Sequence, residues 1–228
     1  YAPLYAFNGA AIMVNSKDGF QTLSSLEGLS TSEVKQRTRT VMEQMRGKKI
    51  GITEGTIAEK VVLDALSTAG MSKADVQLFN ARYEDNLAAF LAGRIDAFVG
   101  GVTERVKARQ GGAVELLIGS AVSDPGIVGW VTTKTFADKH PATMKSLTDN
   151  FFKIARHMTE DPKGRATLAT SYLKGKASVD YTPEEYAYAL AFQYFPRTRE
   201  DAVRTFLRSD SPYYWKGIWD RSNAFLLK

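Results

Sequence analysis

Three short polar turns in the first half of the chain carry residue types that could bind a small solute. The first, residues 53–56, reads Thr-Glu-Gly-Thr and lies between a predicted strand and a predicted helix that starts at Ile57. The first N–H groups of a helix have no partner inside it, and the helix dipole adds partial positive charge, so an anionic group can dock there. Gly55 would let a ligand approach the backbone closely, and Thr56 could cap the helix and offer its hydroxyl.

The same turn has a simpler interpretation, which is a capped connection between a strand and a helix with nothing bound. It is not a phosphate-binding P-loop, because the Gly-Lys-Ser/Thr ending of that motif is missing. Glu54 complicates binding of a plain anion. If its carboxylate faces the ligand, the turn favours a solute that also carries an amine or another cation.

The second and third turns follow the next two predicted strands. In residues 80–85, Arg82 could pair with a carboxylate or sulfonate in bidentate geometry, and Tyr83 could stack on a ligand. In residues 100–103, the pair of glycines permits a tight turn, and Thr103 could cap a helix or bind a ligand oxygen. The alternative for residues 80–85 is a solvated loop in which Asp85 caps the following helix. Ligands of open α/β sheets bind at the carboxyl ends of the strands, where all three turns fall.

The sequence offers little to a catalytic or metal-binding site. Its two histidines, His140 and His157, lack a recognisable Ser–Asp or Glu partner pattern, and no Gly-x-Ser-x-Gly motif is present. The absence of cysteine excludes disulfides, thiol nucleophiles and Cys-based zinc sites. We therefore expect no catalytic residue, no metal and no cofactor. Aromatic residues between Tyr181 and Phe195 have partly helical spacing, which is typical of helix packing and less often of a ligand cage.

Length and composition indicate a folded protein of one large or two small domains. The chain has 228 residues, 44% of them hydrophobic and 24% charged, and no apolar run approaches the roughly 20 residues that span a bilayer. The net charge is +5, from 30 basic and 25 acidic residues scattered along the chain. A nucleic-acid-binding protein gathers basic residues on one face with aromatics among them, so this pattern argues against nucleic acid and favours mild attraction of small anions.

The order of predicted elements indicates an α/β fold. Predicted strands at 10–15, 48–52, 76–80, 95–99 and 114–118 alternate with predicted helices at 57–69, 85–92 and 103–109. This spacing is typical of βαβ units, a mainly parallel sheet and helices on both of its faces. After a strand at 127–133 the pattern becomes helical, with helices predicted at 141–158, 162–174, 183–194, 199–207 and 211–227.

Several stretches together resemble one known family. Residues 47–56 (Gly-Lys-Lys-Ile-Gly-Ile-Thr-Glu-Gly-Thr) resemble the second-lobe opening of ABC-transporter solute-binding proteins of the nitrate, sulfonate, taurine and bicarbonate type, which includes thiamine-pyrimidine-precursor binders. Residues 87–97 are similar to that family's helix, Gly, then Asp-Ala strand. Residues 129–131 and 136–141 are similar to the strand that re-enters the first lobe and the long helix after it. The resemblance covers roughly residues 10–160.

The resemblance implies a type II periplasmic-binding-protein-like fold with two α/β/α lobes and mainly parallel sheets. Residues 1–15 and 124–228 would form part of the first lobe and residues 16–123 the second, with crossovers near Asn15–Ser16 and Ser123–Gly126. Members begin with a segment that forms most of the first lobe, so we expect that lobe to be incomplete here. Neither Tyr1 nor the residues after it show a leader pattern, so we expect a removed targeting segment or a start partway through a longer chain. A helix near 29–46 would be an insertion.

The resemblance also implies a function. The chain would be the extracytoplasmic solute-binding protein of an ABC importer, periplasmic or extracellular and membrane-anchored, which traps a small anionic solute between its lobes and presents it to a membrane permease. The alternative is a ligand-sensing effector domain of a transcriptional regulator or of another sensor with the same fold. An enzyme on this fold is less favoured, since the pyrimidine-synthesising relatives use a cysteine-rich motif and this chain has no cysteine. The predicted ligand contacts are Thr53, Glu54, Gly55, Thr56, Ile57, Arg82, Tyr83, Glu84, Asp85, Gly101 and Thr103.

Overall fold

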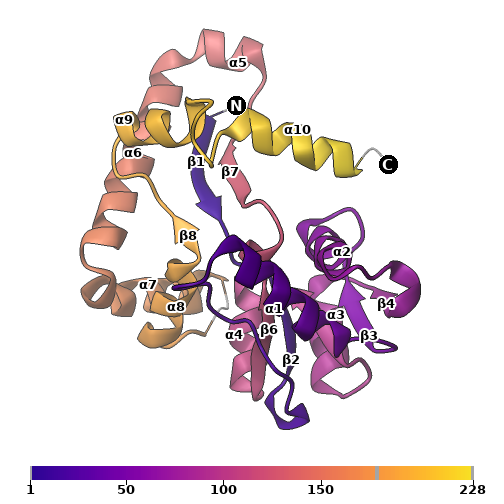
Figure 1. The fold of residues 1–228 in the computed structure, drawn as a ribbon. Helices are drawn as coiled ribbons and strands as arrows, with labels where there is room; N and C mark the ends of the chain where they lie inside the picture. Colours follow the sequence, from indigo (N-terminus) through magenta and orange to yellow (C-terminus); the bar gives the residue numbers. More distant parts are fainter. Residues whose placement is uncertain (1, 178–179, 227–228) are drawn as a thin grey trace. The chain divides into compact units, whose positions relative to one another are not determined.

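The structure is a computed structural model that describes residues 2–177 and 180–226 (Figure 1). The chain divides into two compact units: unit 1 comprises residues 1–7 and 125–228, and unit 2 is the continuous segment from Asn8 to Asp124. The predicted domain limits at residues 1 and 228 and the predicted helix end at residue 227 lie outside the described residues.

Unit 2 is a five-stranded sheet with helices on both faces. Its strands are β2 (Ala11–Asn15), β3 (Lys49–Ile52), β4 (Gln77–Asn80), β5 (Ala97–Gly100) and β6 (Ala113–Ile118), in the spatial order β4-β3-β5-β2-β6. β3 pairs in parallel with β4 and β5, whereas β2 pairs antiparallel with β5 and β6. Four of the five strands therefore run in one direction, as the alternation of predicted elements indicated.

The helices of unit 2 are α1 (Thr31–Glu43), α2 (Ile57–Ala69), α3 (Tyr83–Leu91) and α4 (Val102–Gln110). Alternation along β2 decides which helices cover each face. Ile12 and Val14 pack in a core with residues of α1 and α2, and Ala11 and Met13 pack in a second core with residues of α3 and α4. Three short 3-10 helices, Ser16–Asp18, Lys73–Asp75 and Gly119–Ala121, complete the unit.

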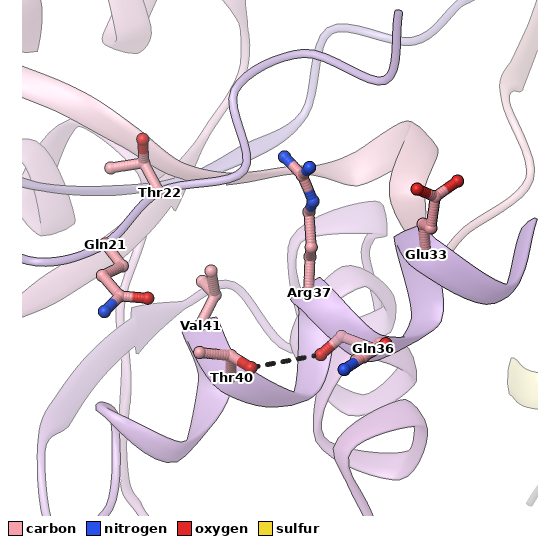
Figure 2. Close-up of a pocket in the computed structure, with 7 residues that line it drawn as sticks. All are labelled: Gln21, Thr22, Glu33, Gln36, Arg37, Thr40 and Val41. Carbon is pink, nitrogen blue, oxygen red and sulfur yellow. Dashed lines mark hydrogen bonds between the residues drawn. The ribbon is translucent and has the colours of Figure 1, made fainter. Parts of the chain in front are cut away.

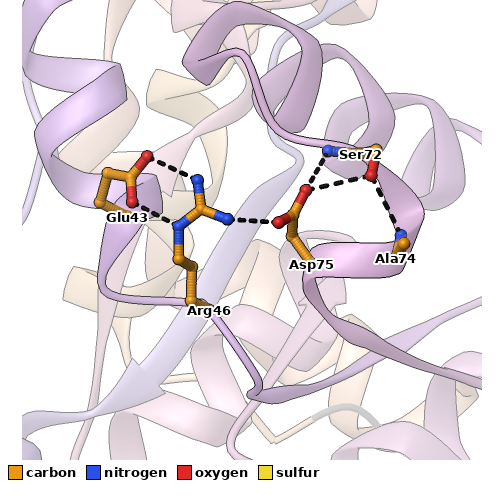
Figure 3. A network of polar contacts seen from close by, with 5 residues as sticks. All are labelled: Glu43, Arg46, Ser72, Ala74 and Asp75. Carbon is orange, nitrogen blue, oxygen red and sulfur yellow. Dashed lines mark hydrogen bonds and ion pairs between the residues drawn. The ribbon is translucent and has the colours of Figure 1, made fainter.

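The helix predicted as an insertion is α1, and it belongs to the core of unit 2. Val41 and Met42 are buried against α2, which α1 packs along. A polar network fastens its last turn to the 3-10 helix before β4 (Figure 3). Arg46 donates to Glu43 and to Asp75, and Asp75 accepts from the backbone N–H and the hydroxyl of Ser72.

Unit 1 has a smaller sheet and more helix. Strands β1 (Ala2–Phe7), β7 (Gly126–Trp130) and β8 (Gln193–Tyr194) pair antiparallel in the order β7-β1-β8. The helices are α5 (Lys134–Lys139), α6 (Pro141–Glu160), α7 (Pro162–Ala177), α8 (Pro183–Ala191), α9 (Arg199–Ala202) with a π-helix at Val203–Leu207, and α10 (Trp215–Leu226). A small core of Ala6, Phe152, Ala202 and Phe206 lies among them.

Three expectations about the fold are wrong. The sheet of unit 1 is antiparallel, because the chain leaves unit 1 along β1 and returns along β7, and two adjacent strands used in this way must run in opposite directions. Residues 8–15 belong to unit 2 and not with residues 1–7, because β2 is hydrogen-bonded on both sides within the larger sheet. The helix predicted at 183–194 ends at Ala191, since residues 193–194 pair with β1.

Candidate binding site

The three polar turns lie at one edge of the unit 2 sheet. β3 pairs in parallel with β4 on one side and with β5 on the other, so the carboxyl ends of these strands share an edge. The first turn follows β3 and leads into α2, the second follows β4 and leads into α3, and the third follows β5 and leads into α4. The sheet thus brings together segments that are separated by up to about fifty positions in the sequence.

The first turn is held in place mainly by its own side chains. Thr56 is the N-cap of α2: its hydroxyl accepts from the Ala58 N–H at 3.2 Å and donates to the Thr53 carbonyl at 2.5 Å. Gly55 has φ of +70°, a left-handed conformation that side chains rarely adopt, so the turn needs glycine there. The capped turn predicted from the sequence is therefore present.

Five hydrogen bonds join the end of β3 and the first turn to the second turn and Asn86 of α3. The Ala81 N–H and the Asn86 amide both donate to the Ile52 carbonyl, at 3.0 and 2.9 Å. Thr53 donates to the Ala81 carbonyl at 2.7 Å. The remaining two bonds run from the Glu54 N–H to the Asn80 side chain at 3.2 Å and from the Tyr83 hydroxyl to the Thr56 hydroxyl at 3.1 Å. The two turns are therefore held together by hydrogen bonds as one structure.

The hydrogen bonds leave some groups available and others occupied. The Thr56 hydroxyl makes one donated and two accepted bonds, so it orders the turn and has little capacity left for a solute. The Gly55 N–H donates to the Glu59 carboxylate at 3.0 Å. By contrast, the N–H groups of Thr56, Ile57 and Glu59 donate to no other residue in the part of the chain that the structure describes.

Asn86 and Gly51 position the site and were not predicted from the sequence. The Asn86 side chain is fully buried, and its amide also donates to the Ala81 carbonyl at 2.9 Å. A Cβ atom on Gly51 would lie 2.6 Å from the Oδ1 atom of Asn86, so β3 needs glycine where this side chain passes. The sequence signal was a polar residue on the buried face of α3, among Leu87, Ala89 and Phe90.

The third turn is close-packed against its own helix. Gly101 is the N-cap of α4, with no side chain to cap the helix. A Cβ atom on Gly100 would lie 2.6 Å from the Cβ of Glu104, and one on Gly101 would lie 3.1 Å from its carboxylate. Thr103 lies in the first turn of α4 and is partly buried. Glycine is therefore required at Gly100 by packing and not by its backbone angles.

Carboxylates dominate this edge of the sheet. Residues 53–59, 82–85 and 101–104 contain a single cation, Arg82, whose side chain is 83% exposed and lies 3.3 Å from Asp85. The same ranges contain the carboxylates of Glu54, Glu59, Glu84, Asp85 and Glu104, of which Glu59 is paired with Lys73 at 3.2 Å. An unaccompanied anion would therefore meet repulsion from these side chains as well as attraction to the backbone amides.

The structure also has pockets away from the three turns. A pocket of about 450 Å³ lies between residues 21–22 and α1, and Figure 2 shows the side chain of Arg37 extending from α1 within it. None of the predicted ligand contacts lines it. A second pocket, of about 410 Å³, lies in unit 1 beside the stacked rings of Tyr194 and Tyr213. Among the described residues, no cluster of three or more His, Asp or Glu side chains is arranged to hold a metal ion.

Comparisons with known sequences give one family model and several curated relatives. The family model described as NMT1/THI5 like matches residues 22–165, which is more than half of the chain. A Brucella abortus protein named as a binding protein is 24% identical over 189 residues, covering 79% of this chain and 58% of the relative. The chain therefore spans less than two thirds of the length of the curated relatives that it matches.

Solved structures show the same fold at low sequence identity. The periplasmic aliphatic sulphonate-binding protein SsuA from Escherichia coli has a TM-score of 0.62 and 18% identity, covering 89% of this chain and 60% of that one. The periplasmic nitrate-binding protein NrtA from Synechocystis PCC 6803 has a TM-score of 0.59 and 12% identity, with coverages of 99% and 67%. A desulfurization enzyme, DSZB, has a TM-score of 0.61 and 11% identity, with coverages of 99% and 71%.

The family model covers both stretches that carried the resemblance, residues 47–56 and 87–97, and the matching structures share the fold that the resemblance implied. They also confirm the α/β class of the fold. Within the described ranges, no helix combines the length and the apolar character needed to cross a bilayer. On the match of the family model over residues 22–165, this chain belongs to the NMT1/THI5-like family.

Proposed function

We propose that this protein is a non-catalytic solute-binding protein of an ABC importer, which binds a small solute at the carboxyl edge of the unit 2 sheet. One observation carries the proposal. Five hydrogen bonds join the end of β3 and the turn after it to the turn after β4 and Asn86, while N–H groups at the start of α2 donate to no other described residue. A rigid backbone with unsatisfied donors is suited to holding the oxygens of an anion. Its relatives among sulfonate- and nitrate-binding proteins support this assignment.

The remaining parts of the proposal follow from the family. Closure of unit 1 over the solute would trap it, and a membrane permease would receive it. We place the protein outside the cytoplasm, in the periplasm or anchored at the outer surface of the membrane. The runner-up, an effector domain of a regulator, is supported by no feature of the described residues. A desulfurization enzyme shares the fold, but these turns present no nucleophile with an adjacent base.

The charge of the site narrows the solute class. Five carboxylates lie in or directly after the three turns, and the single cation among residues 53–59, 82–85 and 101–104, Arg82, is already beside Asp85. A solute that joins an acidic group to an amine would satisfy both features, because its amine can pair with a carboxylate such as Glu54. Among small anionic solutes we therefore favour an amino-substituted sulfonate or carboxylate over a simple anion such as nitrate.

Calorimetric titration and thermal shift with four probes test the proposal: 2-aminoethanesulfonate, ethanesulfonate, nitrate and, as a negative control, chloride. We expect one of the first three to bind, and Gly55→Val to weaken its affinity roughly tenfold or more, because a branched side chain at positive φ distorts the turn. Gly28→Val is the matched control, since Gly28 has φ of +72°, open space around it and a place outside the three turns of the site. Equal affinity in both variants would refute this placement of the site.

Thr56→Ala tests the cap separately from the backbone strain. Loss of the hydroxyl removes the cap of α2 and releases Tyr83, so the variant should bind the same probe more weakly and lose about 1 kcal/mol of stability. Thr22→Ala, an exposed threonine in the same unit, should change neither quantity. Unaltered affinity in Thr56→Ala, measured under conditions in which the variant is folded, would count against a role for this turn.

A further inference from the structure

Two chain segments connect unit 2 to the rest of the molecule, and they lie side by side. We call residues 8–10 the first connector and residues 119–124 the second. The Gly119 N–H donates to the Ala10 carbonyl at 2.7 Å, and the ladder continues with the pairing of Ala11 and Ile118. A Cβ atom on Gly119 would lie 2.7 Å from the Ala10 oxygen, so only glycine allows this approach. The connectors therefore form a joined pair within unit 2.

A buried arginine holds the first connector to α4. Arg105 is 1% exposed, and its guanidinium donates to the Gly9 carbonyl at 2.6 Å and to the Glu115 carboxylate at 3.1 Å. Glu115 is also buried and accepts from Arg109 at 2.9 Å. A guanidinium removed from water needs fixed partners of this kind, so the contact with Gly9 is specific in geometry. The Arg105 N–H donates to the Gly101 carbonyl, which places Arg105 one helical turn beyond the third turn of the site.

An acidic side chain holds the second connector to α2 in a similar way. The Ser123 hydroxyl donates to the Asp64 carboxylate, which also pairs with Lys60. The Lys60 N–H donates to the Thr56 carbonyl, so this pair begins one turn beyond the cap of α2. Each connector is thus bound by a side chain from a helix whose first turn belongs to the candidate site.

We infer that Arg105 and Asp64 are positioning residues, which lock the two connectors to the helices that start at the candidate site. An α-helix is stiff over one or two turns, so a displacement of the first turn of α2 or α4 is passed to the connector that the same helix holds. The part of the inference that concerns solute binding rests on the proposed function. The other part, that these side chains fix the connectors, does not rest on it, and we call it the mechanical half.

Hydrogen exchange without solute tests the mechanical half. Because Arg105→Met alone would leave Glu115 short of a partner in the core, the variant to use is Arg105→Met combined with Glu115→Met, which removes the whole buried pair. Ser123→Ala releases the second connector. We expect exchange in residues 8–12 to rise roughly tenfold in the first variant, and in residues 119–123 by a similar factor in the second, because each loses a hydrogen bond to a charged group.

Matched controls separate this result from a general loss of stability. Lys107→Met removes an exposed charge from α4, and Ser120→Ala removes an exposed hydroxyl within the second connector. Exchange at β3, a strand paired on both sides within the sheet, reports global opening. Faster exchange confined to the connectors supports the inference. Connector rates within twofold of the unmodified protein, or a rise that β3 shares equally, would overturn it.

A second arm adds 2-aminoethanesulfonate or ethanesulfonate. In the unmodified protein we expect slower exchange both at residues 53–58 and in the connectors. In the two variants we expect the slowing to persist at 53–58 and to vanish in the released connector, an effect that a merely structural role does not produce. Persistent slowing in the connectors would overturn the coupling. If neither probe slows exchange at residues 53–58, the proposed function fails for these solutes, and the first arm alone decides the mechanical half.

Discussion

The two units have similar lengths, but they bury their apolar residues to different extents. Of the 40 buried hydrophobic residues among those described, 30 lie in unit 2, whereas 12 of the 13 large hydrophobic residues left exposed lie in unit 1. Unit 2 covers both faces of a five-stranded sheet with its own helices, and unit 1 has a three-stranded antiparallel sheet and a core of four residues. Unit 2 therefore buries enough apolar surface in its own core to fold, whereas unit 1 buries less apolar surface.

The largest expected effect follows directly from this contrast. Unit 2 is one continuous segment, so residues 8–124 can be produced alone, and we expect them to fold. Their circular dichroism should show a mixed α/β spectrum, and urea should unfold them in one cooperative transition. A fragment without cooperative unfolding would contradict the claim that unit 2 is self-contained, and a transition of the full chain at higher urea would measure what unit 1 adds.

The next effect compares one substitution in the two units. Leu66→Ala empties a position in α2 that is 2% exposed, and it should cost about 2–5 kcal/mol in the free energy of unfolding. Leu168→Ala in α7 alters a side chain that is 69% exposed, and it should change that free energy by less than about 0.5 kcal/mol. Urea denaturation of both variants measures the difference. Similar losses at the two positions would show that Leu168 is covered in solution.

The same contrast explains how far the sequence could predict the fold. In unit 2 β3 and β6 are short apolar runs buried between helices, and α2 has one buried side, so the hydrophobic pattern located these three elements within a residue or two. The cap at Gly70 ended α2 where predicted, because its φ of +73° needs glycine. In unit 1 the pattern is weaker. No strand was predicted for residues 2–7, and residues 193–194 were assigned to a helix, since their strand pairing depends on β1.

The candidate site was predictable only in part. Local signals placed the three turns at one edge of a sheet, because the carboxyl ends of parallel strands must meet there. The links between the turns were not predictable, because they join residues far apart in sequence, such as Asn86 and Ile52. The first crossover was misplaced for a similar reason. Residues 11–15 read as a strand from sequence, but the partners that assign it to unit 2 lie some 85–105 positions away.

A pair of glycine substitutions tests the tight packing of the site against the looser packing of unit 1. Gly51→Ala should destabilise the protein by about 1–3 kcal/mol, because its Cβ would lie 2.6 Å from the Asn86 side chain and 2.8 Å from that of Ile95. Gly175→Ala in α7 meets open space in a helix and should stabilise the protein by roughly 0.5–1 kcal/mol. The two changes are chemically identical, so opposite signs in thermal and urea unfolding isolate the environment. A stabilising Gly51→Ala would disprove the contact with Asn86.

The smallest expected effect concerns the polar network at the end of α1, whose contribution to stability is lost at low pH. Hydrogen bonds from the Ser72 N–H and hydroxyl, with Arg46 beside them, lower the pKa of Asp75, and the hydrogen bond from Arg46 lowers the pKa of Glu43. A carboxylate whose pKa is lowered by folding stabilises the protein above its unfolded pKa of about 4, and loses this contribution as pH falls through the folded value. The network is exposed, so its contribution is small and is further reduced by salt.

Asp75→Asn should therefore lower the melting temperature at pH 7 by no more than about 2 °C, and the difference from the unmodified protein should shrink as the pH falls from about 5 to 3. Glu160→Gln in α6 is the control in unit 1, because no ion pair with a described residue involves Glu160 and its difference should stay near zero throughout. Since protonation of Asp75 in the unmodified protein removes the same charge that the substitution removes, the two melting curves must converge at low pH. A difference that persists or grows at pH 3 would mean that Asp75 acts through the geometry of the Ser72 turn, with its charge contributing little.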